Sequence, residues 1–230
     1  MIRLYTHSAL QEGETVNLTD NQVHYLYHVM RRTVGDEFLL FNGQDGEWLG
    51  QAEVLTKKQG CIRLIRQTQE QTQTKGPVLA MSLIKKDNFD LVLQKATELG
   101  VQKIIPLLTE RTVVSKLNME RAKSILIEAA EQCERLDIPQ ILEPTAFKVF
   151  LQMDVGQKVY LSERGQTSGC LDKSNPICFV VGPEGGWSPN EIQAFERQND
   201  TVSLNLGRLI LRAETAAIGI LAAHQFDIFV

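Results

Sequence analysis

Cysteine and histidine are scarce in this chain, with four of each among 230 residues. Neither type is spaced as in C-x-x-C or H-E-x-x-H, so the sequence predicts no zinc site and no other bound metal. Cysteines without a pairing pattern are typical of a reducing compartment, which favours a cytoplasmic location. The positions are His7, His24, His28, His224, Cys61, Cys133, Cys170 and Cys178.

Long apolar segments are also absent. The longest apolar run, Ala216–Ala223, is far below the roughly 18 residues that a membrane span needs. Residues 1–30 include Glu12, Glu14 and Asp20 and contain no apolar run of signal-peptide length. These features predict a soluble intracellular protein without a membrane partner.

The common nucleotide-binding and hydrolase motifs are missing. The chain has no G-x-x-x-x-G-K-[ST], which argues against a P-loop kinase or GTPase, and no G-x-S-x-G of a serine hydrolase. The dinucleotide fingerprint G-x-G-x-x-G is not matched either, because Pro183 stands where the glycine turn would begin.

An excess of positive charge is missing as well. The chain has 24 Lys and Arg against 28 Asp and Glu, a net charge of −4. Nucleic-acid-binding proteins are usually basic on the binding face, so RNA binding would depend on local clusters or on recognition of a folded RNA by shape. Each cluster could equally be ordinary solvated surface. The clusters are Arg31-Arg32, Lys57-Lys58, Lys85-Lys86, and Arg111 with Lys116.

The most informative feature present is the segment Cys178–Gly186, CFVVGPEGG. A short apolar run leads into a loop of glycines and a proline, and then Ser188, Pro189 and Glu191 show the pattern of a capped helix start. Glycines let the backbone approach a ligand closely, so this unit predicts a site for a nucleotide-like ligand. A tight turn that binds nothing is the alternative.

A second strand, loop and helix follow further along the chain. Thr201–Leu206 reads as a short strand, Gly207–Arg212 as a loop, and Ala213–Phe226 as a helix of almost only apolar and small residues. A helix that lacks a polar face is normally buried in a core or in a subunit interface. The residues leave both possibilities open.

The polar run Gln67–Pro77 predicts a turn or linker, because it lacks aromatic residues and closes with Gly-Pro. Its alternation of Gln and Thr leaves an exposed final strand as the alternative. We therefore expect one domain at residues 1–72 and a second at residues 73–230. Short β-type segments with turn signals between them predict a small barrel in the first domain. These segments are Glu14–Leu18, Glu37–Phe41, Trp48–Leu55 and Cys61–Gln67.

Helical spacing of apolar residues over Asn21–Arg32 predicts one helix within the barrel, capped by Asp20 or Asn21. In the second domain strands and helices alternate, which predicts an α/β fold with a mostly parallel sheet and helices on both faces. Pro106 suggests that its strand is an edge strand or carries a bulge. The expected elements are strands Val78–Ile84, Lys103–Leu108 and Lys158–Ser162, a helix Asn88–Leu99 stopped by Gly100, and a helix running from its cap Asn118 to Asp137–Pro139.

Two blocks, V-G-P-E-G-G-W-S-x-x-E from Val181 and L-x-L-G-x-x-I-L-R-x-E-T-A from Leu204, closely resemble the RsmE family of 16S ribosomal RNA uridine N3-methyltransferases. The resemblance covers essentially the whole chain. Further matching blocks are Arg3–Tyr5, His24 with Val29–Arg31, Gly35–Gly43, Leu93–Val101, Glu110–Val114 and Glu128–Arg135. One departure is Leu209, where many members have arginine, while Arg208 stands one position earlier.

The resemblance implies a C-terminal SPOUT methyltransferase domain with a trefoil knot and an N-terminal PUA-like RNA-binding barrel. It further implies a homodimer that uses S-adenosylmethionine to methylate N3 of uridine 1498 in the 16S RNA of the small ribosomal subunit. The implied cofactor residues are Leu161, Val181, Gly182, Pro183, Glu184, Gly185, Gly186, Leu206, Gly207, Leu209, Ile210 and Leu211. The implied RNA-binding residues are Arg3, His24, Arg31 and Arg32.

Such a reaction needs no protein nucleophile and no metal, because the cofactor carries its own electrophilic methyl group. Uracil N3 must lose a proton, so a base, or cations beside the uracil oxygens, would assist. We expect Arg111, Arg212 and Glu214 to act in catalysis, among polar residues of the blocks that also include Glu98, Gln132 and Arg135. Structural ion pairs are the alternative for each of them.

Other functions remain compatible with the sequence. A related knotted methyltransferase could modify a ribose 2′-oxygen or a tRNA base, and a non-enzymatic rRNA-binding assembly factor could use the barrel alone. A metabolic enzyme that binds another nucleotide would suit the acidic charge.

Overall fold

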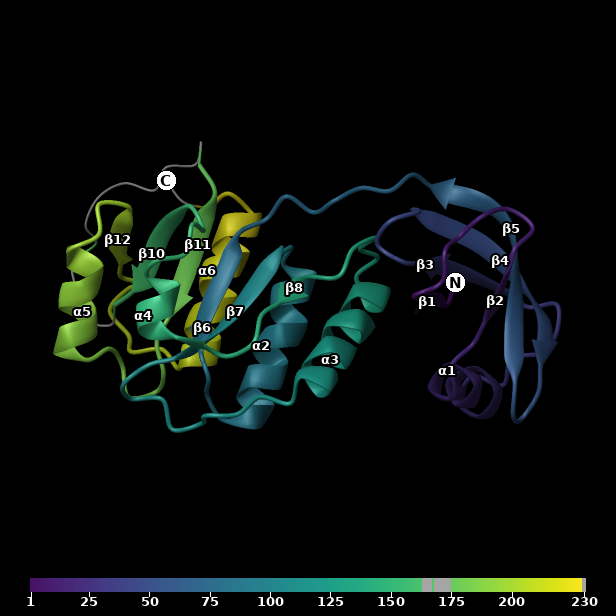
Figure 1. The fold of residues 1–230 in the computed structure, drawn as a ribbon, viewed down its shortest axis with the longest axis horizontal. Coiled ribbons are helices and arrows are strands. Elements are labelled where there is room, and N and C mark those ends of the chain that lie inside the picture. Colours follow the sequence, from purple (N-terminus) through teal and green to yellow (C-terminus); the bar gives the residue numbers. More distant parts are fainter. Residues whose placement is uncertain (163–166, 168–174, 229–230) are drawn as a thin grey trace. The chain divides into compact units, whose positions relative to one another are not determined.

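The computed structural model describes residues 1–162, 167 and 175–228, and it divides the chain into two compact units. Unit 1 contains Met1–Gln73 together with Ala130–Ile138, and unit 2 contains Thr74–Ala129 and Pro139–Val230. Cys170 lies outside the described residues. Each unit has its own sheet (Figure 1).

Unit 1 is built on a five-stranded mixed sheet in the order β1-β3-β4-β5-β2. The β1·β3 pair is parallel and the other pairs are antiparallel, with register shifts between β4 and β5 that mark β-bulges. The strands are β1 (Arg3–Tyr5), β2 (Thr15–Asn17), β3 (Glu37–Phe41), β4 (Glu47–Leu55) and β5 (Gly60–Gln69). All four predicted strands are confirmed, and β1 is additional.

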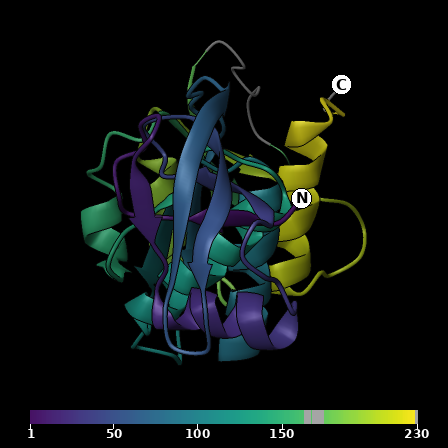
Figure 2. The same cartoon turned by 90° about the vertical axis from the view of Figure 1, so that its right-hand side faces the viewer.

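The predicted single helix of unit 1 is two elements, a short α1 (Asp20–His24) and a π-helical turn η1 (Tyr25–Val29). Thr19, and not Asp20 or Asn21, is the cap, because its hydroxyl and the side chain of Gln22 satisfy each other's backbone N–H groups. Leu26 is fully buried in the core beneath the sheet. Both views place α1 at one end of the strands (Figures 1 and 2).

Unit 2 is built on a parallel sheet in the order β12-β10-β11-β6-β7-β8, with β9 also paired to β7. Its two central strands, β6 and β11, are buried along their whole length, as expected for strands covered on both faces. The strands are β6 (Val78–Ser82), β7 (Lys103–Leu108), β8 (Gln140–Ile141), β9 (Thr145–Ala146), β10 (Gln157–Leu161), β11 (Ile177–Val181) and β12 (Thr201–Leu204).

Pro106 does not mark an edge strand or a bulge, and that expectation was wrong. It pairs in regular register with Met81 of β6. On its other side β7 is paired at Lys103 and Ile104 with β8, and at Leu107 and Leu108 with β9. Pro106 therefore occupies the interval between two short partners, where its missing N–H leaves no ladder bond unmade.

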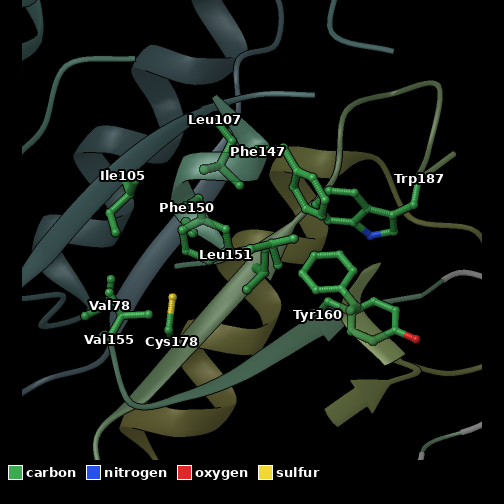
Figure 3. Close-up of a cluster of buried hydrophobic side chains, with 13 residues drawn as sticks. Val78, Ile105, Leu107, Phe147, Phe150, Leu151, Val155, Tyr160, Cys178 and Trp187 are labelled. Carbon is green, nitrogen blue, oxygen red and sulfur yellow. The ribbon is translucent and has the colours of Figure 1, made fainter. Parts of the chain in front are cut away.

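Helices cover both faces of the sheet, which confirms the predicted α/β class. The face of Cys178 and Val180 packs against α4 (Phe147–Phe150) and α5 (Pro189–Glu196) in one apolar cluster, in which Phe150, Leu151 and Trp187 are drawn in Figure 3. The opposite face packs against α6 (Ala213–Gln225), where the ring of Phe179 contacts that of His224 at a centroid distance of 5.4 Å.

Two further helices lie in the part of the chain that the structure describes. α2 (Lys86–Glu98) contacts α6 and is stopped by Gly100, whose φ of +79° is the predicted left-handed conformation. Asn118 caps α3 (Met119–Gln132) by accepting the N–H of Arg121 at 3.0 Å, as predicted. The helix was expected to continue to Asp137, but it stops at Gln132 because Glu134 turns left-handed (φ 62°).

Candidate active site

The loops that follow three adjacent strands meet at one edge of the unit 2 sheet. β10, β11 and β12 are parallel neighbours, so their carboxyl ends, at Leu161, Val181 and Leu204, lie at the same edge. A cleft of about 620 Å³ opens there. Crevices at the carboxyl ends of parallel strands are the usual ligand sites of α/β folds.

The two glycine-containing motifs of the sequence both line this cleft. All of the predicted cofactor residues are among its lining residues: Leu161, Val181, Gly182, Pro183, Glu184, Gly185, Gly186, Leu206, Gly207, Leu209, Ile210 and Leu211. Of the residues expected to act in catalysis, Arg111 and Arg212 also line it. Lining residues that the sequence did not single out are Ser162, Trp187, Ile192, Leu204, Asn205, Ala213 and Ala216. Most of them lie within the two motif blocks and Ile192 directly follows the first block, so their place in the sequence was a signal. Ser162 is adjacent to neither block.

The loop after β11 is shaped by a turn and by an indole ring. The N–H of Gly186 donates to the Pro183 carbonyl at 2.8 Å, and Gly186 has a φ of +67°. Trp187 is buried and its indole N–H donates to the carbonyl of Leu161 at 2.8 Å, which joins this loop to the end of β10. A Cβ on Gly182 would lie 3.0 Å from the Trp187 ring, so a larger residue here would force the ring or the loop to shift.

The loop after β12 is held by Asn205. Its side-chain oxygen accepts the N–H of Gly207 at 2.8 Å, and its own N–H donates to Thr167 at 3.3 Å. Gly207 has a φ of +118°, a conformation that side chains rarely adopt. The next apolar side chains, Leu209 and Ile210, are 81% and 65% exposed at the cleft. Apolar groups this exposed in a cleft are suited to cover an apolar ligand or a partner surface.

The two arginines at the cleft come from different loops. Arg111 donates from Nη1 to the carbonyl of Gly185 at 2.8 Å. This bond places its guanidinium beside the loop after β11, residues 182–186, which we call the glycine loop. The side chain of Arg212 is 83% exposed, and its Nη1 lies 4.0 Å from Oε1 of Glu214. Glu214 itself is 8% exposed and is not among the residues that line the cleft. Its Oε2 is buried and has no hydrogen-bond partner among the described residues.

The other polar residues named in the sequence blocks, Glu98, Gln132 and Arg135, are not among those that line the cleft. Glu98 pairs with Lys95 at 2.8 Å within α2, and Arg135 pairs with Asp137 at 3.1 Å in unit 1. Gln132 is exposed at the end of α3. Cys178 is fully buried, and desolvation raises the pKa of its thiol to about 12, so it is not a nucleophile at neutral pH.

Three of the four predicted RNA-binding residues lie on or next to the η1 turn of unit 1. His24 and Arg31 are exposed, and Arg32 is half-buried. The ring centroids of His24 and His28 lie 5.1 Å apart on the same surface, and Tyr25 there is 42% exposed. The turn therefore presents cations and aromatic rings together, the combination used to bind phosphates and unpaired bases.

Arg3 is in a different environment. It is 7% exposed, its Nε pairs with Glu47 at 2.7 Å, and its other nitrogens donate to the carbonyls of Ala130 and Arg135, each at 3.1 Å. Its guanidinium also lies 4.6 Å from the centroid of the Phe41 ring. The donors of Arg3 are thus engaged inside unit 1, which gives the residue structural contacts in this fold. The RNA contact predicted for Arg3 stays a prediction.

Among the described residues, no cluster of three or more His, Cys, Asp or Glu could hold a metal ion. No helix in the described part of the chain is long and apolar enough to cross a membrane.

Comparisons with known proteins agree along the whole chain. Residues 72–225 match the family model of the RNA methyltransferase domain, and residues 18–65 match that of the RNA methyltransferase PUA domain. A ribosomal RNA small subunit methyltransferase E from Rickettsia conorii is 36% identical, over 96% of this chain and 93% of that protein. The enzyme of the same name from Synechocystis is 38% identical, over 88% and 70% of the two chains.

Solved structures of two methyltransferases are also similar to this chain. A methyltransferase from Legionella pneumophila in complex with the cofactor SAM superposes with a TM-score of 0.88 and 30% identity, covering 98% of this chain and 97% of that one. A ribosomal RNA small subunit methyltransferase E from Neisseria gonorrhoeae bound to S-adenosyl methionine gives a TM-score of 0.87 at 32% identity, with the same coverage.

Proposed function

Because this chain belongs to the RsmE family of RNA methyltransferases, we propose that it transfers a methyl group from S-adenosylmethionine to N3 of uridine 1498 in 16S ribosomal RNA. Methylation of ribosomal RNA with this cofactor is the activity of the family. The choice of N3 and of that single uridine is the part that awaits experiment.

The observation that carries the proposal is the convergence of both motif loops on one cleft at the carboxyl ends of β10, β11 and β12. Its residues fit the cofactor. A Cβ at Gly186 or Gly207 would meet no atom of the described residues within 4 Å, which leaves room for an adenosine against the backbone at these two positions. Leu161 and Val181 supply an apolar floor, and Leu209 and Ile210 an apolar cover. We expect these loops to form the trefoil knot of the SPOUT class, although most of the loop after β10 lies outside the described residues.

The cofactor, when bound, supplies an electrophilic sulfonium methyl group. The chain's own task is to hold the uracil, remove its N3 proton and stabilise the charge that then spreads onto the two uracil oxygens. We assign Arg111 and Arg212, the cations lining the cleft, to those oxygens. Glu214 lies 4.0 Å from Arg212, and we assign its carboxylate the role of holding that guanidinium at the cleft by charge.

We further propose that residues 1–72 hold the RNA and residues 73–230 the cofactor. On unit 1 the η1 surface supports this, through His24, Arg31 and Arg32. Phosphate contacts from such residues fix position without reading sequence, so the shape of the folded RNA would have to select the uridine. The substrate is then an assembled or nearly assembled small subunit in the cytoplasm.

A homodimer is the proposed oligomeric state. α6 buries Ala217, Ile220 and Leu221 within its own chain, but it leaves Gly219 and the following Phe226 exposed. A strip of small and apolar residues on a helix allows close packing against a two-fold copy. Light scattering of active protein at micromolar concentration should give twice the chain mass of 25.9 kDa, and a monomer mass would contradict the dimer.

The test of function is to incubate the protein with methyl-labelled cofactor and small subunits that lack the modification, and then to map the label by nuclease digestion and mass spectrometry. Label on N3 of a single 16S uridine is expected, and an Arg212→Ala variant should give at least a tenfold lower rate with bound cofactor unchanged. Label on ribose, or on tRNA alone, would assign the chain to a different methyltransferase activity.

A further inference from the structure

Glu191 makes a contact that its place at a helix start does not require. It occupies the third position of α5, is 3% exposed, and forms a capping box with Ser188. Its Oε2 accepts the N–H of Ser188 at 2.8 Å, which is the usual capping bond. Its Oε1 accepts the backbone N–H of Glu110 at 2.9 Å, a residue 81 positions away in the sequence.

The chain has a second capping box, in α1, with which that of α5 can be compared. The capping box of α1 uses glutamine at the same position, where the side-chain oxygen of Gln22 accepts the N–H of Thr19 at 3.0 Å. The amide nitrogen of Gln22 then donates to a carbonyl, that of Tyr5, at 2.8 Å. In α5 the second partner is an N–H donor, and a carboxylate can accept from one partner with each of its two oxygens, which an amide cannot do. The carboxylate at residue 191 therefore suits the contact with Glu110, whereas the cap alone could equally use glutamine.

The Glu110 N–H that donates to Glu191 belongs to a β-turn that also contains Arg111. The N–H of Thr112 donates to the carbonyl of Thr109 at 3.2 Å, so Glu110 and Arg111 are the two central residues of the turn. One side of the turn is fixed by Glu191 through Glu110, and the other by Arg111, which donates to Gly185 at 2.8 Å. The turn is thereby joined to the loop after β11 at Gly185 and to the start of α5 at Glu191.

We propose that Glu191 is a positioning residue, which fixes the turn 109–112 so that the guanidinium of Arg111 lies over the glycine loop in the geometry needed for methyl transfer. The inference rests on the proposed function, because it assigns Glu191 a part in that reaction. Two backbone N–H groups donate to one buried carboxylate here. Charge-assisted hydrogen bonds of this kind are strong and directional, which suits a residue that positions a turn.

The principal test is Glu191→Gln, which keeps the size of the side chain and one acceptor but sets an amide N–H₂ against an N–H donor. We expect kcat for small-subunit methylation to fall at least tenfold, with the KM of the cofactor and the Kd of S-adenosylhomocysteine within threefold of wild type. In an Arg111→Ala background the same change should cause no further loss of kcat. Amide hydrogen exchange at Glu110 should be faster in E191Q than in wild type.

Two controls separate positioning from capping. Ser188→Ala weakens the same cap but leaves both acceptor bonds of Glu191, and Glu110→Ala keeps the backbone N–H; each should retain at least half of the wild-type kcat and the slow exchange at Glu110. If E191Q does not fold, Glu110→Pro deletes the same hydrogen bond from the other side, and proline is well suited to this turn position. Its kcat should fall like that of E191Q.

Wild-type kcat in a folded E191Q, or an equal loss of kcat with and without Arg111, would overturn the inference. Inactivity of the wild-type protein on small subunits would instead overturn the proposed function. Exchange at Glu110 would then still decide whether Glu191 holds the turn, since that measurement needs no substrate.

Discussion

The indole N–H of Trp187 donates to the carbonyl oxygen of Leu161 at 2.8 Å, and this bond joins the glycine loop to the end of the neighbouring strand β10. Both residues are less than 10% exposed, so no solvent molecule readily replaces the donor. The bond therefore fixes the spacing between two walls of the cleft.

Replacing Trp187 by phenylalanine should remove this bond while keeping most of the aromatic packing against Phe147 and Phe195. The buried Leu161 carbonyl would be left unsatisfied, which costs about 1–3 kcal/mol of unfolding free energy. We expect a loss of that size in urea denaturation and a weaker affinity for S-adenosylhomocysteine by calorimetry. Unchanged affinity in a destabilised variant would restrict the bond to a structural role.

Gly182 packs against the same indole ring. In Gly182→Ala the new Cβ would lie 3.0–3.3 Å from three ring atoms, so either the ring or the loop must shift. Gly182→Val would shift them further. We expect the affinity for S-adenosylhomocysteine to fall at least tenfold in the alanine variant and to be lost in the valine variant. A denaturation midpoint near that of wild type is the control for folding, and wild-type affinity in both variants would remove this loop from the cofactor site.

The Arg3–Glu47 pair is buried, with both side chains at most 5% exposed. In Arg3→Ala the Glu47 carboxylate loses its cation, and removal of one partner of a buried pair typically costs about 3–5 kcal/mol. Arg3→Met, which fills the space, should lose less. The exposed pair Arg63–Glu53 is the matched control, because R63A should change stability by less than about 1 kcal/mol. Loss of RNA affinity in a folded R3M protein would indicate that Arg3 also contributes to RNA binding.

Arg31 and Arg32 should contribute to RNA affinity through phosphates. Replacing both by alanine should weaken binding to small subunits and reduce the dependence of log K on log salt by roughly 0.7–0.9 per lost contact. The affinity for S-adenosylhomocysteine should not change. R121A with K123A removes the same charge from residues that are paired with Asp90 and Glu120, and should leave RNA affinity intact. Equal weakening by both double variants would indicate only a general charge effect.

Stability at alkaline pH should depend on Cys178. Burial raises the pKa of this thiol from 9.0 to about 12, so the folded state retains a proton that the unfolded state releases above pH about 9. The thiol's contribution to stability is complete below pH 9 and is lost as the pH rises towards 12. Urea midpoints between pH about 8 and about 11 should therefore fall more steeply for wild type than for Cys178→Ala. Parallel slopes would show that this thiol does not set the alkaline limit.

Local sequence patterns were sufficient for the elements whose signals lie within a few residues. Strands Glu37–Phe41 and Lys103–Leu108 match β3 and β7 at both ends, and Ser188 caps its helix as predicted. Short apolar runs and capping residues are short-range signals, so the sequence alone can show them. The end of α3 was misplaced by the same reasoning, because the apolar spacing continues through Cys133 and Leu136 after the helix has stopped.

The motifs by themselves determined that two glycine-containing loops exist and that their residue types suit a nucleotide-like ligand. Only the tertiary structure decided that the loops meet, because β10 pairs with β12 on one side and β11 on the other, an order unlike that of the sequence. It also decided that Arg3 is buried with Glu47 and that Glu191 holds Glu110, partners 44 and 81 residues apart. Strand order and such long-range hydrogen bonds depend on how the whole chain packs, and no local pattern of residues encodes them.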